Sequence, residues 1–147
     1  MAKRVVVDSS VALKWWLDDE EFVEEARTIL KKAVANEIEL VVPELWFYEI
    51  ANGLNVAVRR QRISRKLGSE FVEELQAVGV TQIPVASQLG EIFQAAQKYG
   101  CAVYDIAYLI IAEQEGIYLV TGDRKFFNVV AGEKSFVKYL SDLTQIL

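Results

Sequence analysis

Histidine is absent from this chain of 147 residues, and cysteine occurs only once, as Cys101. Without an imidazole the chain has no histidine-type zinc site, no Ser-His-Asp triad and no histidine acid–base pair. A single thiol forms no disulfide within the chain, which is typical of a protein in a reducing compartment. Acid–base or metal chemistry must therefore rest on carboxylates, hydroxyls, lysine, tyrosine or this thiol.

Glycine and proline are scarce, at eight and two residues, whereas 52% of the residues are hydrophobic. This composition excludes a disordered or low-complexity chain, and the length suits one domain spanning residues 1–147. Long apolar runs are also missing. The longest covers residues 106–112, far below the ~20 residues of a membrane span, and three apolar residues before Asp8 are too few for a signal peptide. We expect a soluble, cytoplasmic protein with no membrane partner.

The net charge is −5 and the isoelectric point is near 4.9. Bulk positive charge is therefore excluded as a means of binding nucleic acid, which leaves metal ions or a local basic patch. The mean hydropathy of +0.18 is high and favours an interface with a second subunit or a partner.

Short, continuous apolar runs alternate with helical patterns along the chain. The runs predict strands over residues 4–7, 38–42, 82–85, 117–121 and 136–140, and their continuity suits parallel strands covered on both faces. Helical periodicity lies between them, over residues 20–32, 44–58, 63–78, 89–99 and 104–115. The fold class is therefore α/β: a three-layer α/β/α sandwich with a mainly parallel sheet of about five strands.

Several details of the helices can also be predicted. Asp18 and Asp19 are placed to cap the first acidic helix, and Gly116 is placed to end the helix over 104–115. That last helix is apolar nearly all round, so we expect it to be central. In the helix over 89–99, the side chains expected to face inward are those of Leu89, Ile92, Phe93, Ala96 and Tyr99.

Four acids from distant segments should meet at one edge of this sheet. Asp8 and Asp123 follow predicted strands, while Glu49 and Asp105 lie near the start of helices that run back from the same edge. Ligands of open parallel sheets bind beyond the carboxyl ends of the strands. The topology therefore predicts a cluster of four carboxylates there.

Each acid also has an ordinary structural interpretation. Asp8 and Asp123 suit turns after strands, and Asp105 suits a helix cap. Glu49 is harder to explain in this way, because it lies in a mostly apolar helix where a carboxylate without a partner is unfavourable.

Taken together, the four acids predict a metal site. Carboxylates held close together repel one another, and a hard divalent cation such as Mg²⁺ or Mn²⁺ offsets that repulsion with oxygen ligands. Two such ions, roughly 3.5–4 Å apart, activate water and stabilise the leaving oxygen of a phosphodiester, with a carboxylate or a metal-bound hydroxide as the base. The hypothesis fails if the oxygens lie too far apart to share a ligand sphere, or if lysine or arginine fills the gap.

The segments around these acids resemble the PIN-domain family, and most closely the toxin ribonucleases of VapBC toxin–antitoxin pairs. The matching segments are VVVDSS (5–10), PELWFYEIANGL (43–54), YDIAYLIIA (104–112) and LVTGDRKF (119–126). The resemblance implies a metal-dependent endoribonuclease with catalytic and metal-binding Asp8, Glu49, Asp105 and Asp123. It further implies supporting hydroxyls at Ser10 and Thr121, an RNA substrate and a cognate antitoxin protein. Ile106 departs from the family, where a small residue often follows the third acid.

A basic cluster stands out against the acidic whole. Residues 50–69 hold no acid and five bases, Arg59, Arg60, Arg62, Arg65 and Lys66, and Arg124 directly follows Asp123. We expect these six residues to bind the phosphates of RNA, although cations near a helix end are also ordinary solvated groups. The aromatic residues at positions 15, 16 and 46–48 favour the core or an interface over base stacking, and suit a homodimer or an antitoxin groove.

Other functions remain to be weighed against the toxin. A housekeeping PIN nuclease that processes rRNA or tRNA, and a non-catalytic PIN module that binds RNA or protein, both fit the same fold. A haloacid-dehalogenase-like phosphatase is excluded because Ser10 stands where its second aspartate is needed. A receiver domain and the glycine-rich nucleotide folds lack their defining acids and glycines.

Overall fold

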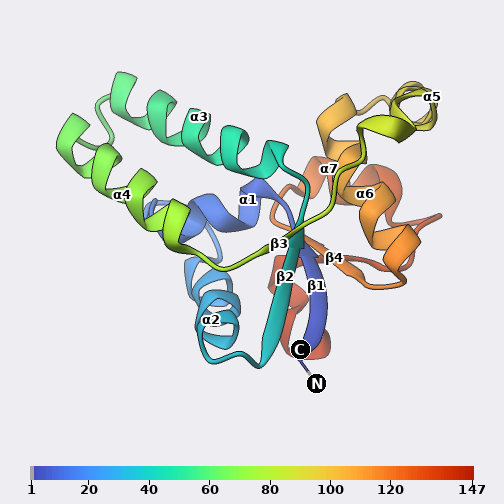
Figure 1. The fold of residues 1–147 in the computed structure, drawn as a ribbon, viewed down its shortest axis with the longest axis horizontal. Coiled ribbons are helices and arrows are strands. Elements are labelled where there is room, and N and C mark those ends of the chain that lie inside the picture. The colour runs from blue at the N-terminus through green and yellow to red at the C-terminus, as the bar shows by residue number, and fades with distance from the viewer. Residues whose placement is uncertain (1) are drawn as a thin grey trace.

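Five parallel strands form one sheet in the computed structural model, which describes residues 2–147 (Figure 1). Their order is β3-β2-β1-β4-β5, so the first strand is central. The bounds are β1 Lys3–Val7, β2 Ile38–Val42, β3 Thr81–Gln82, β4 Tyr118–Thr121 and β5 Val137–Tyr139. In the centre of the sheet Val6 lies opposite Val41 on one side and Leu119 on the other. The predicted parallel sheet is confirmed.

Helices cover both faces of the sheet. Figure 1 shows α1 (Ser9–Ala12), α2 (Val23–Val34), α3 (Leu45–Arg59) and α4 (Arg65–Ala77) on one side. On the other side are α5 (Leu89–Tyr99), α6 (Val103–Glu115) and α7 (Arg124–Val130). Three 3₁₀ turns, η1 (Leu13–Trp15), η2 (Ala86–Gln88) and η3 (Leu140–Gln145), complete the elements. The three-layer α/β/α sandwich is therefore confirmed.

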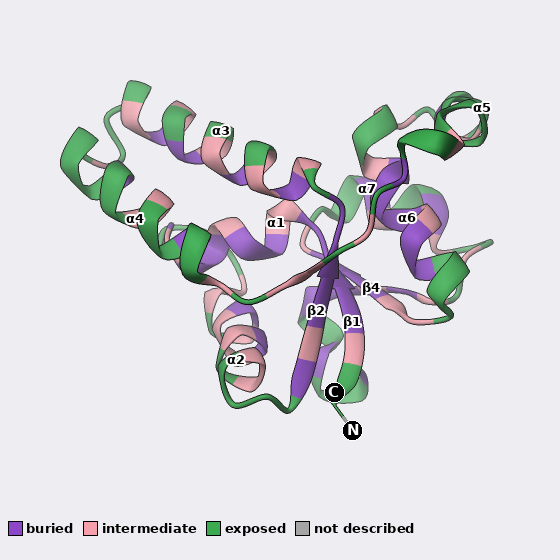
Figure 2. Cartoon of the chain, in the orientation of Figure 1, coloured by how far each residue is buried: buried purple, intermediate pink, exposed green. Residues whose placement is uncertain are grey.

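The core lies between the sheet and the helices that pack on it. Figure 2 shows the strands buried over most of their length, while the outer faces of α3 and α4 are exposed. Trp46 and Leu54 of α3 are buried on one side of the sheet, and Ile106, Tyr108 and Ile111 of α6 on the other. Helix α6 is apolar nearly all round because it is central, as predicted: it packs against both β1 and β4. Gly116 ends α6 in the left-handed conformation that glycine adopts readily.

Three predictions about the elements are wrong. The third strand is only Thr81–Gln82, because Pro84 has no N–H to continue the ladder. Asp18 and Asp19 do not cap α2, which begins at Val23 after Phe22; the Asp19 carboxylate instead accepts two hydrogen bonds from Arg62, at 2.5 and 3.1 Å.

The third error concerns α5. Leu89 and Phe93 are 57% and 54% exposed rather than inward-facing. Figure 1 shows α5 at the periphery, where it packs on α6. The buried face of α5 is therefore narrow and consists of Ile92 and Ala96. Within residues 2–147, no helix combines the length and the apolar character that a membrane crossing demands.

Candidate metal centre

Asp8 is held in a defined orientation at the carboxyl end of β1. Its Oδ1 accepts hydrogen bonds from Ser10 Oγ at 2.5 Å and from the Val11 N–H at 3.3 Å, so it caps α1. Its Oδ2 accepts a hydrogen bond from Thr121 Oγ1 at 2.5 Å. These three bonds occupy three of the roughly four lone-pair sites of a carboxylate, which leaves one for a further ligand.

The end of β4 is tied to the same network. Ser10 Oγ accepts from the Gly122 N–H at 2.8 Å, and Thr121 Oγ1 accepts from the Asp123 N–H at 3.0 Å. Asp123 in turn caps α7 by accepting from the Phe126 N–H at 3.1 Å. Two hydroxyls therefore hold the carboxyl ends of neighbouring strands together and fix the orientation of Asp8. Ser10 and Thr121, which the family resemblance implies as supporting hydroxyls, both donate to the Asp8 carboxylate.

Glu49 lies on the first turns of α3 and meets a partner from α6. The hydroxyl of Tyr108 donates to Glu49 Oε1 at 2.5 Å, and the Tyr108 ring is buried. In the sequence, Tyr108 belongs to the segment YDIAYLIIA (104–112), and no role is predicted for it there. A signal was available: Tyr108 is three residues after Asp105, and residues so spaced share one face of a helix.

Mutual repulsion links the four carboxylates. Burial raises the pKa of Asp8 to about 6, and the charge of Asp105 adds to that rise. Burial likewise raises the pKa of Glu49 to about 7, with further increases from Asp105 and Asp8. Burial and the neighbouring Asp123 raise the pKa of Asp105. Asp105 is thus the one member that interacts with all three others, and the four acids form one electrostatic cluster at this edge.

No basic side chain forms an ion pair with the cluster within residues 2–147. None of the ion pairs there involves Asp8, Glu49, Asp105 or Asp123. The same residues contain no group of three acids or thiols whose atoms already converge on one ion position. The Asp8 and Glu49 carboxylates are directed toward hydroxyl groups instead.

The donor set nevertheless fits a hard divalent cation. Mg²⁺ keeps several water ligands and is held by as few as one or two carboxylates, so a preformed cage of three is not required. Asp8 retains a free lone-pair site, and the acids repel one another without an ion pair to a base within residues 2–147. The chemistry of the oxygen ligands and their charge therefore match Mg²⁺ or Mn²⁺.

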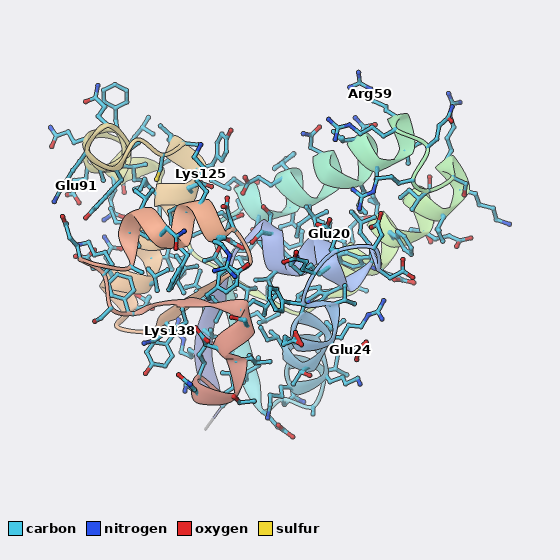
Figure 3. All side chains as sticks on the ribbon, turned by 180° about the vertical axis from the view of Figure 1, so that it is seen from behind. Glu20, Glu24, Arg59, Glu91, Lys125 and Lys138 are labelled. Atoms are coloured by element: carbon cyan, nitrogen blue, oxygen red, sulfur yellow. The ribbon has the colours of Figure 1, made fainter. Side chains whose placement is uncertain are left out.

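The six basic residues predicted to bind RNA are dispersed. Arg62 is anchored to Asp19 and lies 3.6 Å from Glu20. Arg59, Arg62 and Arg65 line a cavity of about 1180 Å³ between α3 and α4. Figure 3 shows Arg59 at the far end of α3. Ten residues separate it from Glu49, which is about 15 Å along a helix. Arg60 and Lys66 lie exposed around the turn that joins these helices, whereas the Arg124 guanidinium stacks 4.4 Å from the centre of the Tyr139 ring.

Ile106 and the aromatic residues are mostly structural. Ile106 is buried and lines a small cavity between α5 and α6. Trp15 and Trp46 are buried with their ring centres 6.1 Å apart, which confirms the prediction that they belong to the core. Tyr48, next to Glu49, is exposed.

Known proteins resemble this chain over most of its length. Ribonuclease VapC3 of Pyrobaculum aerophilum is 33% identical over 126 residues, which cover 83% of this chain and 91% of that protein. Ribonuclease VapC9 of Mycobacterium tuberculosis is 30% identical over 119 residues, or 81% of this chain and 85% of that protein. The crystal structure of PAE2754 from Pyrobaculum aerophilum has the same fold, with a TM-score of 0.67 and 24% identity over 99% of this chain and 98% of that one.

The family assignment follows from a match that covers far more than half of the chain. Residues 5–132 match the family described as PIN domain, and this span includes all four acids of the cluster. The chain therefore belongs to the PIN-domain family.

Proposed function

We propose that this protein is a metal-dependent endoribonuclease that hydrolyses RNA phosphodiesters with Mg²⁺ or Mn²⁺, and that it is the toxin of a toxin–antitoxin pair. The observation that carries the proposal is the cluster of four carboxylates, each repelled by Asp105 or repelling it and none in an ion pair within residues 2–147, at the edge of the sheet where ligands bind. Relatives that cover most of the chain are named VapC ribonucleases, which supports an RNA substrate and a cognate antitoxin.

Asp8, Glu49, Asp105 and Asp123 would hold the cation, which when bound supplies an activated water and stabilises charge on the phosphate. The chain's own residues do the rest. Ser10 and Thr121 keep Asp8 oriented by donating to both of its oxygens. Tyr108 fixes Oε1 of Glu49, and Oε2 accepts no hydrogen bond from residues 2–147, so that Oε2 can accept a proton from water.

The basic residues are proposed to bind RNA along α3 and α4. Arg59, Arg60, Arg65 and Lys66 have no ion pair within residues 2–147, so their charges are available to phosphates. Arg62 has less capacity, because Asp19 already binds its guanidinium. Arg124 contributes from the start of α7, next to Asp123. We further propose a cytoplasmic location for this activity.

Expression of the wild-type chain without an antitoxin is expected to arrest bacterial growth, and Asp8→Asn is expected to abolish the arrest. The physical reason is that the amide removes one negative ligand while keeping the shape of the side chain. Growth curves after induction, with matched protein levels checked by immunoblot, measure the effect. Arrest caused equally by both forms would contradict a catalytic toxin, and growth unaffected by a nuclease that cleaves RNA in vitro would favour the processing enzyme.

We also propose a homodimer, or a higher homo-oligomer. Leu89 and Phe93 are one helical turn apart on α5 and both are more than half exposed, in a chain whose mean hydropathy is +0.18. A second copy would remove this apolar pair from water. Light scattering is expected to give at least twice the 16.6 kDa mass of one chain. A monomer for Phe93→Lys would support this interface, whereas an unchanged mass for that variant would exclude it.

A further inference from the structure

Lys14 is the one buried basic residue among residues 2–147, where the buried polar side chains are those of Asp8, Lys14 and Thr121. It lies in η1, the 3₁₀ turn that follows α1, and α1 itself begins directly after Asp8. Its exposed fraction is 6%, close to the 8% of Asp8. Lysine is almost never buried to this degree unless it is paired, so its position requires a reason.

The stem of Lys14 lies against the carboxyl end of β4. A Cβ atom added at Gly122 would be 2.9 Å from Lys14 Cε and 3.3 Å from Ser10 Oγ. A side chain at position 122 would enter the space that Lys14 Cε occupies, whereas the backbone there does not require glycine, because its φ is not positive. Cε carries the ammonium group, so the positive charge is one bond away from an atom that lies beside Gly122, the residue that joins Thr121 to Asp123 in the chain.

The ammonium group has no partner in the part of the chain that the structure describes. Within residues 2–147 no carboxylate lies within 4.0 Å of Lys14 Nζ, and no side chain or backbone oxygen accepts a hydrogen bond from it. The buried side-chain atoms there that lack a partner are Glu25 Oε2 and Trp46 Nε1, so Lys14 Nζ retains contact with solvent. The aliphatic part of the Lys14 side chain is therefore buried, while its ammonium group reaches solvent near the edge where the acids meet.

We propose that Lys14 binds a phosphate of the RNA strand beside the scissile bond. The inference rests on the proposed ribonuclease activity and adds a substrate-binding residue to it. The acid cluster repels a phosphodiester backbone, and a cation fixed at the same edge offsets that repulsion for one phosphate group. An ammonium that no carboxylate neutralises is free to donate to a phosphate oxygen as a charge-assisted hydrogen bond.

The salt dependence of RNA binding tests this role. Binding of a fluorescent single-stranded RNA is measured by anisotropy at several salt concentrations, with Asp105→Asn as the parent so that the RNA remains intact. Adding Lys14→Met is expected to weaken binding about ten-fold, the equivalent of one charge-assisted hydrogen bond. The slope of log Kobs against log salt should fall by about 0.7, the value for one phosphate contact on a single strand.

Two controls separate this role from a structural one. Lys31→Met removes an unpaired, exposed lysine of α2, and it should leave the slope unchanged. Lys14→Met keeps a long apolar stem over Gly122 and removes an ammonium group that has no ion pair within residues 2–147, so its melting temperature should equal or exceed that of the parent. Lys14→Arg, which keeps the charge, should retain most of the slope.

The outcomes are distinct. An unchanged slope for Lys14→Met would overturn the proposal for Lys14 and leave the ribonuclease intact. A lower melting temperature together with an unchanged slope would assign Lys14 to packing alone. Absence of RNA binding by the parent, combined with absence of RNA cleavage by the wild-type protein, would overturn the proposed function itself.

Discussion

Asp105→Asn is expected to lower the rate of RNA cleavage by about 10²–10³-fold while the protein stays folded. The charge of Asp105 raises the pKa of Asp8 and of Glu49, and Asp123 raises the pKa of Asp105, so Asp105 is coupled to all three other acids. The amide of asparagine keeps the shape of the side chain, but it carries no negative charge, and its NH₂ group replaces one of the oxygens that a cation would bind. Initial rates on a single-stranded RNA at saturating Mg²⁺ or Mn²⁺, together with circular dichroism, measure the effect.

Glu113→Gln is the matched control for this experiment. Glu113 is also an acid of α6, but it is exposed and forms an ion pair with Lys134 at 3.0 Å. Its replacement should leave the cleavage rate within about two-fold of wild type, because surface pairs contribute little. Retained cleavage in Asp105→Asn would remove Asp105 from the mechanism, and equal losses in both variants would point to a general effect on α6.

The sequence was sufficient to predict the sheet and the edge at which the acids meet. Valines in β1 and β2 form continuous runs that only strands covered on both faces can bury, and in parallel strands the carboxyl ends coincide. Asp8 directly follows β1, and Asp123 comes two residues after the end of β4, so their proximity required no knowledge of side-chain contacts.

Side-chain partners across the fold were beyond that reasoning. The hydrogen bond from Tyr108 to Glu49 joins α6 to α3, and the pairing of Arg62 with Asp19 joins the α3–α4 turn to the segment before α2. Neither pair is close in sequence, and each depends on how two helices are positioned on the same sheet. The exposure of Leu89 could not be predicted for a similar reason. Helical periodicity shows which side chains lie on one face of a helix, but it does not show how much of that face the rest of the protein covers.

A second large effect is expected on stability: without divalent cations, Asp8→Asn should be more stable than wild type at pH 8. Burial raises the pKa of Asp8 from its ordinary 3.8 to about 6, so the folded protein binds its proton more tightly than the unfolded chain does. Stability from this group is present below about pH 4 and is lost as the pH rises through 6. The shift corresponds to at most about 3 kcal/mol, and about 1 kcal/mol is expected, since an amide meets the Ser10 and Thr121 hydroxyls less well.

Urea unfolding in EDTA, at pH 5 and at pH 8, measures this difference. The free energy of unfolding of wild type should decrease between these pH values more than that of Asp8→Asn. Addition of Mg²⁺ or Mn²⁺ should reverse the order at pH 8, because a cation at 100 times its Kd stabilises only the form that binds it, by about 2.7 kcal/mol. Asp8→Asn could instead be the less stable form at pH 8 without cations. The ionised carboxylate would then stabilise the fold. That result would refute the argument that repulsion and burial at this edge destabilise the protein until a cation binds.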